Sequence, residues 1–150
     1  MNDSPWLLDV NVPMYAAGQA HPYKEACVWV MTEIAEGRLA VAIDTETIQE
    51  ILYRYAALRR WETAVTLATN LLDLVPMVYP VLPADARLAI QLFEQYASQE
   101  IKARDLLHVA VMLNNHLSGI LSADEHFDRI PGINRLDPQE LFGQAQSGPA

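Results

Sequence analysis

The sequence lacks the features that mark secreted, membrane and disulfide-stabilised proteins. It has a single cysteine, Cys27, so no internal disulfide framework can form, and this usage is typical of a reducing compartment. No apolar run approaches the ~18 residues that a membrane span needs, and residues 1–5 lack the basic start of a signal peptide. We therefore expect a cytoplasmic protein with no membrane association, in which Cys27 is part of a helix packed in the core.

Positive charge is also scarce. The chain has 10 Lys and Arg residues against 19 Asp and Glu residues, which gives a formal net charge of −9. This balance excludes a protein that binds nucleic acid by bulk charge alone. It does not exclude a metal-dependent nuclease, because such an enzyme gathers carboxylates around a cation that supplies the positive charge. The acidic surplus favours a basic partner.

Glycine is sparse and scattered. None of the 6 glycines belongs to a glycine-rich phosphate-binding loop, which counts against a nucleotide-binding enzyme. With 150 residues, of which 51% are hydrophobic, the chain can bury one real core and is not disordered. We assign residues 1–143 to a single domain and residues 144–150 to a flexible C-terminal tail.

Short apolar runs alternate with longer segments of helical periodicity. The stretch at residues 6–11 begins with a short apolar run that is typical of a strand buried on both faces. This run is followed by the carboxylate of Asp9. Further strands are expected at residues 39–43, 77–79, 120–122 and 133–136, and helices at 13–17, 22–36, 45–58, 62–74, 83–96 and 103–117, with a helical turn at 124–130. Since no two strands are close enough to form a hairpin, we predict an α/β fold with a mainly parallel sheet flanked by helices.

Four carboxylates are candidates for one site. In an open parallel sheet, ligands bind outside the carboxyl ends of the strands, where Asp9 and Asp124 are expected. Helices that start from those ends bring Glu50 and Asp105 toward the same rim. Simpler interpretations stay open: Glu50 can pair with Arg54 at i,i+4, Asp105 can favour the positive end of its helix, and Asp124 can be a solvated turn residue.

The combination favours a site over these separate interpretations. Asp105 begins an otherwise apolar run, where an unpaired charge is costly. Asp124 and Asp128 are spaced at i,i+4 and repel each other unless a cation lies between them. Carboxylates without His or Cys among them form an all-oxygen site, which selects Mg²⁺ or Mn²⁺ over zinc.

At these residues the sequence resembles the PIN-domain nucleases, and among them the toxins of VapBC-type toxin–antitoxin pairs. The resemblance extends from about residue 7 to residue 138, and its motifs are residues 8–12, 48–52, 103–110 and 121–130. One departure is Val10, where these toxins usually have Thr. The resemblance implies a five-stranded parallel sheet in a three-layer sandwich, and metal-dependent endonucleolytic cleavage of RNA.

The resemblance also implies roles for the individual residues. Asp9 and Asp105 look like the principal metal ligands. Glu50 would complete the site, directly or through water, or help to activate the attacking water, and Asp124 would bind a second metal or hold metal-bound water. The residues expected to orient these ligands are Asn11, Ser122 and Asp128. Near the proposed rim, the residues that could hold RNA phosphates, if they are not merely solvated, are Lys102, Arg104 and Arg129.

A toxin of this kind implies a cognate antitoxin, and a homodimer is also expected. The carboxylate cluster favours an inhibitor that inserts an Arg or Lys among the four acids. A histidine base at His108 or His126 is possible, although a metal-based hydrolysis does not need one. The alternatives are a PIN-like protein-binding module with little or no nuclease activity, and a phosphatase, which would want a second Asp at the position of Asn11.

Overall fold

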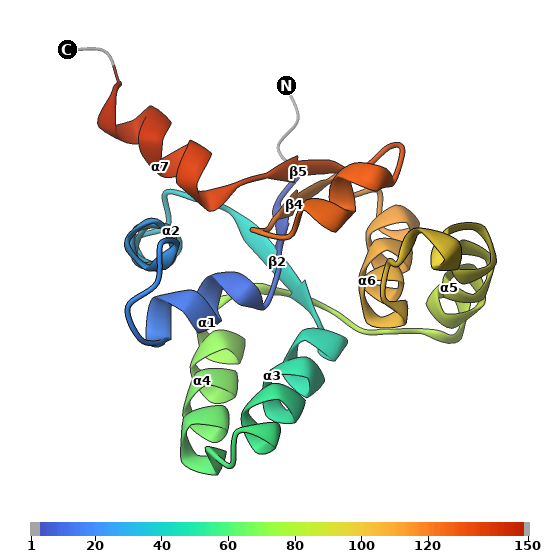
Figure 1. The fold of residues 1–150 in the computed structure, drawn as a ribbon, viewed down its shortest axis with the longest axis horizontal. Coiled ribbons are helices and arrows are strands. Elements are labelled where there is room, and N and C mark those ends of the chain that lie inside the picture. Colours follow the sequence, from blue (N-terminus) through green and yellow to red (C-terminus); the bar gives the residue numbers. More distant parts are fainter. Residues whose placement is uncertain (1–3, 149–150) are drawn as a thin grey trace.

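The computed structural model describes residues 4–148. In this part of the chain the sheet has five strands: β1 (Trp6–Leu8), β2 (Val41–Asp44), β3 (Met77–Tyr79), β4 (Gly119–Leu121) and β5 (Asn134–Leu136). The strand order is β3-β2-β1-β4-β5, and every neighbouring pair is parallel (Figure 1). The prediction of a parallel five-stranded sheet is confirmed, with residues 77–79 at an edge as expected.

Helices cover both faces of this sheet. They are α1 (Asn11–Ala17), α2 (Lys24–Ala35), α3 (Thr45–Ala57), α4 (Trp61–Leu74), α5 (Pro83–Tyr96), α6 (Ala103–Asn114) and α7 (Pro138–Gln146), with short 3-10 helices η1 (Ala97–Gln99) and η2 (Glu125–Arg129). Neighbouring residues of β1 point to opposite sides, so Leu8 packs with α2, α3 and α4 whereas Leu7 packs with α5 and α6. The result is the three-layer sandwich that the resemblance implied (Figure 1).

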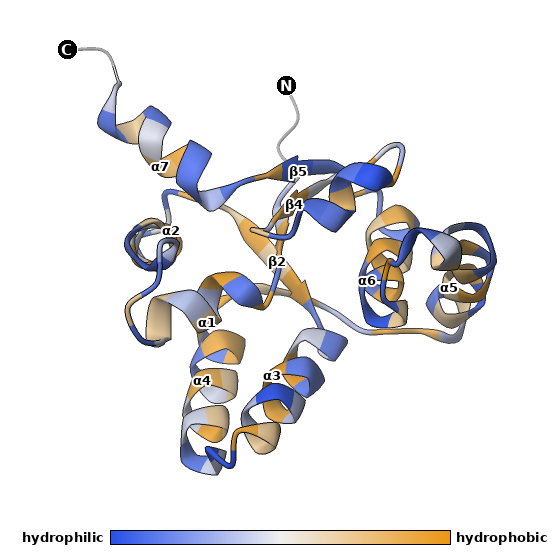
Figure 2. Cartoon of the chain, viewed as in Figure 1, coloured by the Kyte–Doolittle hydropathy of each residue, from blue (hydrophilic) through white to orange (hydrophobic). Residues whose placement is uncertain are grey.

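The apolar strands and inner helix faces supply the two cores. Hydrophobic residues concentrate on the sheet and on the sides of the helices that face it, while polar residues lie outward (Figure 2). Cys27 is fully buried, as expected, and burial raises the pKa of its thiol to about 12. Within residues 4–148, no helix is both long and apolar enough to cross a membrane.

Helix α7 was not among the expected elements. Asp137 caps it, because its Oδ1 accepts a hydrogen bond of 2.7 Å from the Gln139 amide, and Pro138 occupies the first helical turn. The helix continues to Gln146, so residues 144–146 of the expected flexible tail are helical. Residues 149–150 of that tail lie outside the described residues.

Candidate active site

Three adjacent strands end in polar residues at the same rim of the sheet. Asp9 directly follows β1, Asp44 is the last residue of β2, and Ser122 directly follows β4. Because β2, β1 and β4 are neighbours and run parallel, their carboxyl ends lie side by side. All three residues are buried, so the rim is a polar floor set into an apolar fold.

Asp9 is held by donors on both sides. The Ser122 hydroxyl donates to Oδ2 at 2.6 Å, the Val10 amide donates to Oδ1 at 2.8 Å, and Asn11 Nδ2 donates to Oδ2 at 3.2 Å. Burial raises the pKa of Asp9 by more than the Ser122 and Val10 hydrogen bonds and the charge of His108 lower it, and the charge of Glu50 raises it further. The structure thus brings the predicted Asn11 and Ser122 into contact with the predicted Asp9.

Asp105 lies in the first turn of α6 and is 7% exposed. Among residues 4–148, its carboxylate has neither a hydrogen bond nor an ion pair, in contrast with every other acid at this rim. Burial raises its pKa to about 7, and the negative charge of Asp9 is the next largest cause; the charge of His108 lowers it, while Asp124 and Glu50 raise it further. Asp105 is therefore close to the other predicted acids, and within residues 4–148 no hydrogen bond or ion pair compensates its charge.

Glu50 has a different environment, although it is equally buried. Its Oε1 lies 3.2 Å from Nε2 of His108, and its Oε2 lies 3.4 Å from Nε of Arg54. The i,i+4 pair with Arg54, one of the two interpretations of the sequence, is thus present. The other ring nitrogen of His108, Nδ1, lies 2.6 Å from Asp44 Oδ2. Burial alone lowers the pKa of His108, but the hydrogen bonds to Asp44 and Glu50 outweigh it and hold that pKa well above its usual value.

Asp124 and Asp128 do not act as a pair. Asp124 caps η2, since its Oδ1 accepts from the His126 amide at 2.9 Å, and its own amide donates to the Ser122 hydroxyl at 2.9 Å. Asp128 instead makes two contacts with Arg135, at 3.0 and 3.1 Å, and its side chain is 53% exposed. Arg135 also donates to the Ser122 carbonyl at 3.1 Å. Asp128 is therefore connected to the rim through Arg135, which bonds both Asp128 and the Ser122 carbonyl.

The three basic residues proposed for RNA differ in their availability. Lys102 is exposed at the start of α6, and its side chain makes no hydrogen bond or ion pair within residues 4–148. Arg104 lies 3.2 Å from Glu46 and 4.9 Å from the centre of the Tyr53 ring. Arg129 donates to the Gln99 carbonyl at 2.7 Å. Lys102 is thus the most accessible of the three cations.

The donor chemistry at this rim fits a hard divalent cation. Asp9, Asp105 and Asp124 supply oxygen ligands, and the negative charges of Asp9 and Asp124 both raise the pKa of Asp105. In the described part of the chain, however, no three His, Cys, Asp or Glu side chains converge closely enough to form a ligand set. The residues therefore fit the cation in chemistry and charge, while the ligand shell itself is not assembled.

The sequence interpretation did not include Asp44 in the site and did not foresee that His108 joins Asp44 to Glu50. The rule that selected Asp9 also applies to Asp44, because it too follows a short apolar strand run and ends a strand next to β1. His108 lies three residues after Asp105 on α6, so both face the same side of the helix. These two signals were sufficient to include both residues in the site.

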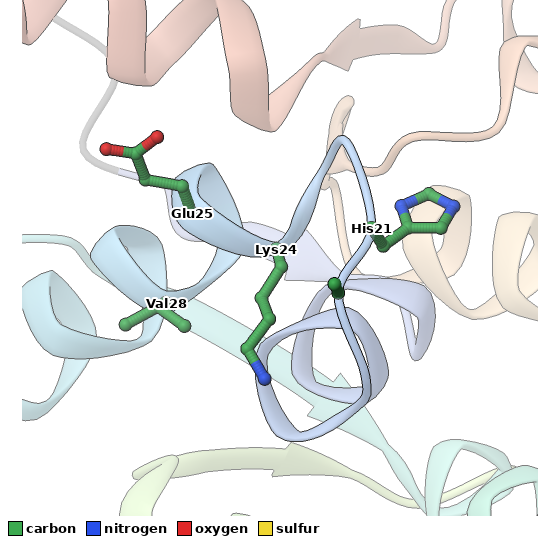
Figure 3. A pocket seen from close by; sticks show the side chains of 5 residues that line it. His21, Lys24, Glu25 and Val28 are labelled. Carbon is green, nitrogen blue, oxygen red and sulfur yellow. The ribbon is translucent and has the colours of Figure 1, made fainter.

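The molecule also has shallow hollows that do not include the acids of the rim. One of about 410 Å³ lies where α1 gives way to α2 and is lined by Ala20, His21, Lys24, Glu25 and Val28 (Figure 3). Its Lys24 donates to the Gly18 carbonyl, which closes the end of α1. These side chains form no cluster of catalytic type.

Comparisons with known proteins agree with this geometry. The family profile described as PIN domain matches residues 6–133. A VapC ribonuclease of Mycobacterium bovis is 35% identical over 130 residues, which cover 87% of this chain and 98% of the relative. Ribonuclease VapC13 of Mycobacterium tuberculosis matches to the same extent, and ribonuclease VapC7 of that organism is 27% identical over 88% of this chain and 90% of its own length.

Solved structures share the fold at low sequence identity. VapC20 of Mycobacterium tuberculosis, described as a sarcin-ricin loop cleaving toxin, has a TM-score of 0.69 at 15% identity and covers 82% of this chain and 92% of its own. VapBC2 of Rickettsia felis, solved with a promoter DNA fragment, has a TM-score of 0.68 at 15% identity and covers 89% of this chain and 98% of the other. With a family profile that spans most of the chain and relatives at 35% identity, the chain belongs to the PIN-domain family.

Proposed function

We propose that this protein is a metal-dependent endoribonuclease that acts as the toxin of a toxin–antitoxin pair. The observation that carries the proposal is the uncompensated charge at the rim: Asp105 is buried beside Asp9 and has no hydrogen bond or ion pair within residues 4–148. A buried charge of this kind is costly unless a cation balances it. The names of the VapC ribonuclease relatives support RNA as the substrate.

The proposed cation is Mg²⁺ or Mn²⁺, held by Asp9 and Asp105 with Asp124 at the side. Such a cation supplies Lewis acidity, which offsets the charge that develops on a phosphate and lowers the pKa of water. The chain's own residues do the positioning. Ser122 and Asn11 fix the Asp9 carboxylate, and the Asp124 amide donates to the same Ser122 hydroxyl, so these groups form one connected network.

The substrate contacts fall to the cations near the rim. Lys102 is exposed and available to a phosphate. Arg104 stacks on Tyr53, and this arrangement leaves its guanidinium near the start of α6, where it can also face a phosphate. With a net charge of −9, the molecule depends on such local contacts rather than on its overall charge to bind RNA.

The test of this function is cleavage of RNA by the purified protein with Mg²⁺ or Mn²⁺, with and without EDTA. We expect cleavage that requires the cation and disappears in EDTA and in Asp105→Asn, while the exposed control Asp73→Asn on α4 keeps full activity. Full activity in EDTA would exclude the carboxylate mechanism. No cleavage of any RNA by a folded, cation-loaded protein would favour the alternative of a protein-binding module.

The proposed partner is a small cytoplasmic antitoxin that blocks the rim. Structural neighbours of this fold have been solved as VapBC complexes, and an arginine from the antitoxin would balance the charge of Asp9 and Asp105. Exposed apolar residues for packing are present on α3, at its C-cap and at the start of α4, namely Tyr53, Leu58 and Trp61. A double-mutant cycle between Asp9→Ala and each basic residue of the partner should show coupling for one of them; a complex that cuts RNA at the full rate would rule this mode out.

A homodimer also belongs to the proposal. The exposed apolar side chains Ile90 and Phe93 on α5 are 69% and 50% accessible, which supports a contact between two copies. Light scattering of the purified protein should give twice the mass of one chain. A monomer at all concentrations would remove the dimer from the proposal without affecting the catalytic part.

A further inference from the structure

His108 connects two carboxylates that come from different parts of the chain. Its Nδ1 lies 2.6 Å from Asp44 Oδ2 at the end of β2, and its Nε2 lies 3.2 Å from Glu50 Oε1 on α3. The side chains of Asp44, His108 and Glu50 are 0%, 4% and 5% exposed. A buried imidazole is thus held at both nitrogen atoms by acids.

Hydrogen-bond stoichiometry defines the charge of this cluster. Ionised carboxylates only accept hydrogen bonds, and a neutral imidazole has only one N–H to donate. Both contacts are hydrogen bonds to ionised carboxylates only if the ring carries two protons. With the contact of Arg54 to the other oxygen of Glu50 at 3.4 Å, two cations then balance Asp44 and Glu50.

Asp44 is itself rigidly placed. Its Oδ1 accepts from the Thr47 amide at 3.0 Å, and its own amide donates to the Thr47 hydroxyl oxygen at 3.3 Å, which is a capping box at the start of α3. The helix cap therefore fixes the Asp44 side chain, Asp44 fixes the His108 ring, and the ring contacts Glu50.

We propose that His108 is a positioning residue that holds Glu50 in place and balances its charge, so that Asp9 and Asp105 bind the divalent cation while Glu50 serves turnover. The part of this proposal that concerns turnover depends on the proposed nuclease function, whereas the part that concerns cation binding does not. Glu50 faces Arg54, which is 41% exposed at its side chain, so the positioned carboxylate lies near the edge that a substrate can approach.

This role predicts effects of opposite sign. If His108 is replaced by a neutral side chain, Asp44 and Glu50 lose their buried counter-charge, and the rim beside Asp9 and Asp105 becomes more negative. Mn²⁺ should then bind about fivefold more tightly, because nearby like charges favour a cation. Turnover should fall by roughly tenfold or more, because Glu50 is no longer fixed. A residue that only supported the fold would weaken both.

The experiment measures Mn²⁺ binding to the metal-free protein by calorimetry and, separately, RNA cleavage at saturating Mn²⁺. The variants are His108→Gln, which keeps one donor, and His108→Leu, which keeps none; the control is His116→Asn, exposed just beyond the same helix. We expect unchanged Mn²⁺ affinity and turnover for the control, tighter Mn²⁺ binding for both His108 variants, and slower turnover for Leu than for Gln. Circular dichroism verifies the fold; if the His108 variants do not fold, Asp44→Asn, which removes the acid that holds the ring, should slow turnover and leave Mn²⁺ affinity unchanged within about twofold.

A mutant cycle tests whether His108 acts through the two carboxylates that it contacts. In an Asp44→Asn, Glu50→Gln background, His108→Gln should change Mn²⁺ affinity by less than about twofold, because neither carboxylate that it balances is charged any longer. Parallel loss of Mn²⁺ affinity and turnover in His108→Gln, or an equal change in Mn²⁺ affinity in both backgrounds, overturns the proposal. If the wild-type protein cleaves no RNA, the proposed function fails, and the Mn²⁺ cycle still decides the role of His108.

Discussion

Two groups of acids lie at the same rim of one sheet and differ in what balances them. Asp44 and Glu50 are in contact with His108 and Arg54, so this group carries its own counter-charges. Asp9 and Asp105 receive hydrogen bonds from neutral donors or none at all, and burial raises the pKa of both. Both groups are buried, so burial alone does not distinguish them.

The role of a carboxylate at this rim therefore depends on the groups that it contacts and not on its location alone. A buried carboxylate that is paired with a cationic side chain can stay ionised at a low cost in free energy. A buried carboxylate without such a partner is a site for an external cation. In this rim the compensated group lies toward α3 and the uncompensated group toward α6 and β1.

The largest effect is expected from neutralising the uncompensated acids. Asp9→Asn or Asp105→Asn should lower RNA cleavage by at least ~1,000-fold, because each removes a proposed ligand of the cation that balances the phosphate. Initial rates at saturating Mn²⁺ measure this, with Asp73→Asn as the exposed control. Near-normal rates in a folded Asp105→Asn variant would contradict the assignment of this group.

A second prediction concerns the pH dependence of stability without metal. The folded-state pKa of Asp105 is about 7 against an ordinary 3.8, so the folded state binds the proton more tightly than the unfolded state. The contribution of Asp105 to the free energy of unfolding should therefore be most favourable below about pH 4. It should decrease by up to ~3 kcal/mol as the pH rises toward 7.

The matched variant isolates this contribution. Asp105→Asn cannot ionise, so its free energy of unfolding should lose that decline between pH 4 and 7, and near pH 7 it should exceed that of the wild-type protein in EDTA. Urea unfolding at several pH values measures both. Identical pH profiles for the two proteins would show that the buried charge is compensated in solution.

A smaller effect is expected at Asp124. Asn keeps the capping oxygen that accepts from the His126 amide but removes the charge that reaches Asp105. We expect roughly tenfold slower cleavage and a free energy of unfolding within ~0.5 kcal/mol of the wild-type value. A large loss of stability would mean that Asp124 mainly holds η2.

The smallest effect is expected at Asp128. Its contacts with Arg135 are exposed at Asp128, so Asp128→Asn should lower the free energy of unfolding by less than ~1 kcal/mol and cleavage by less than about threefold. Thermal unfolding and initial rates measure both. A loss of activity as large as that of Asp124→Asn would place Asp128 in the site itself.

The sequence predicts the sheet and the location of Asp9 at its rim well because both depend on local pattern. Short apolar runs ending in polar residues determine where β1 and β4 stop, and parallel topology then brings Asp9 and Ser122 together. The helix that the pattern missed, α7, begins at Asp137-Pro138, a pair that signals a helix start, but no element was predicted for residues 137–143.

The partners of the acids were harder to predict because they depend on side chains from distant segments. Glu50 and His108 are 58 residues apart, and His108 and Asp44 are 64 apart, so no spacing rule joins them. The i,i+4 spacing of Asp124 and Asp128 suggested a shared cation, yet Arg135 on β5 lies next to Asp128 and takes up its charge. Which acid is compensated is a property of the packed fold.

The most direct test of the contrast is the Mn²⁺ affinity of the metal-free wild-type protein, Asp105→Asn and Glu50→Gln, measured by calorimetry under one set of conditions. Asp105→Asn should weaken Mn²⁺ binding by more than about tenfold, and Glu50→Gln by less than about threefold, since the charge of Glu50 is already balanced within the protein. Glu62→Gln, exposed on α4, serves as the control. Equal losses for Asp105→Asn and Glu50→Gln, or unchanged binding in Asp105→Asn, would contradict the division of this rim into two groups.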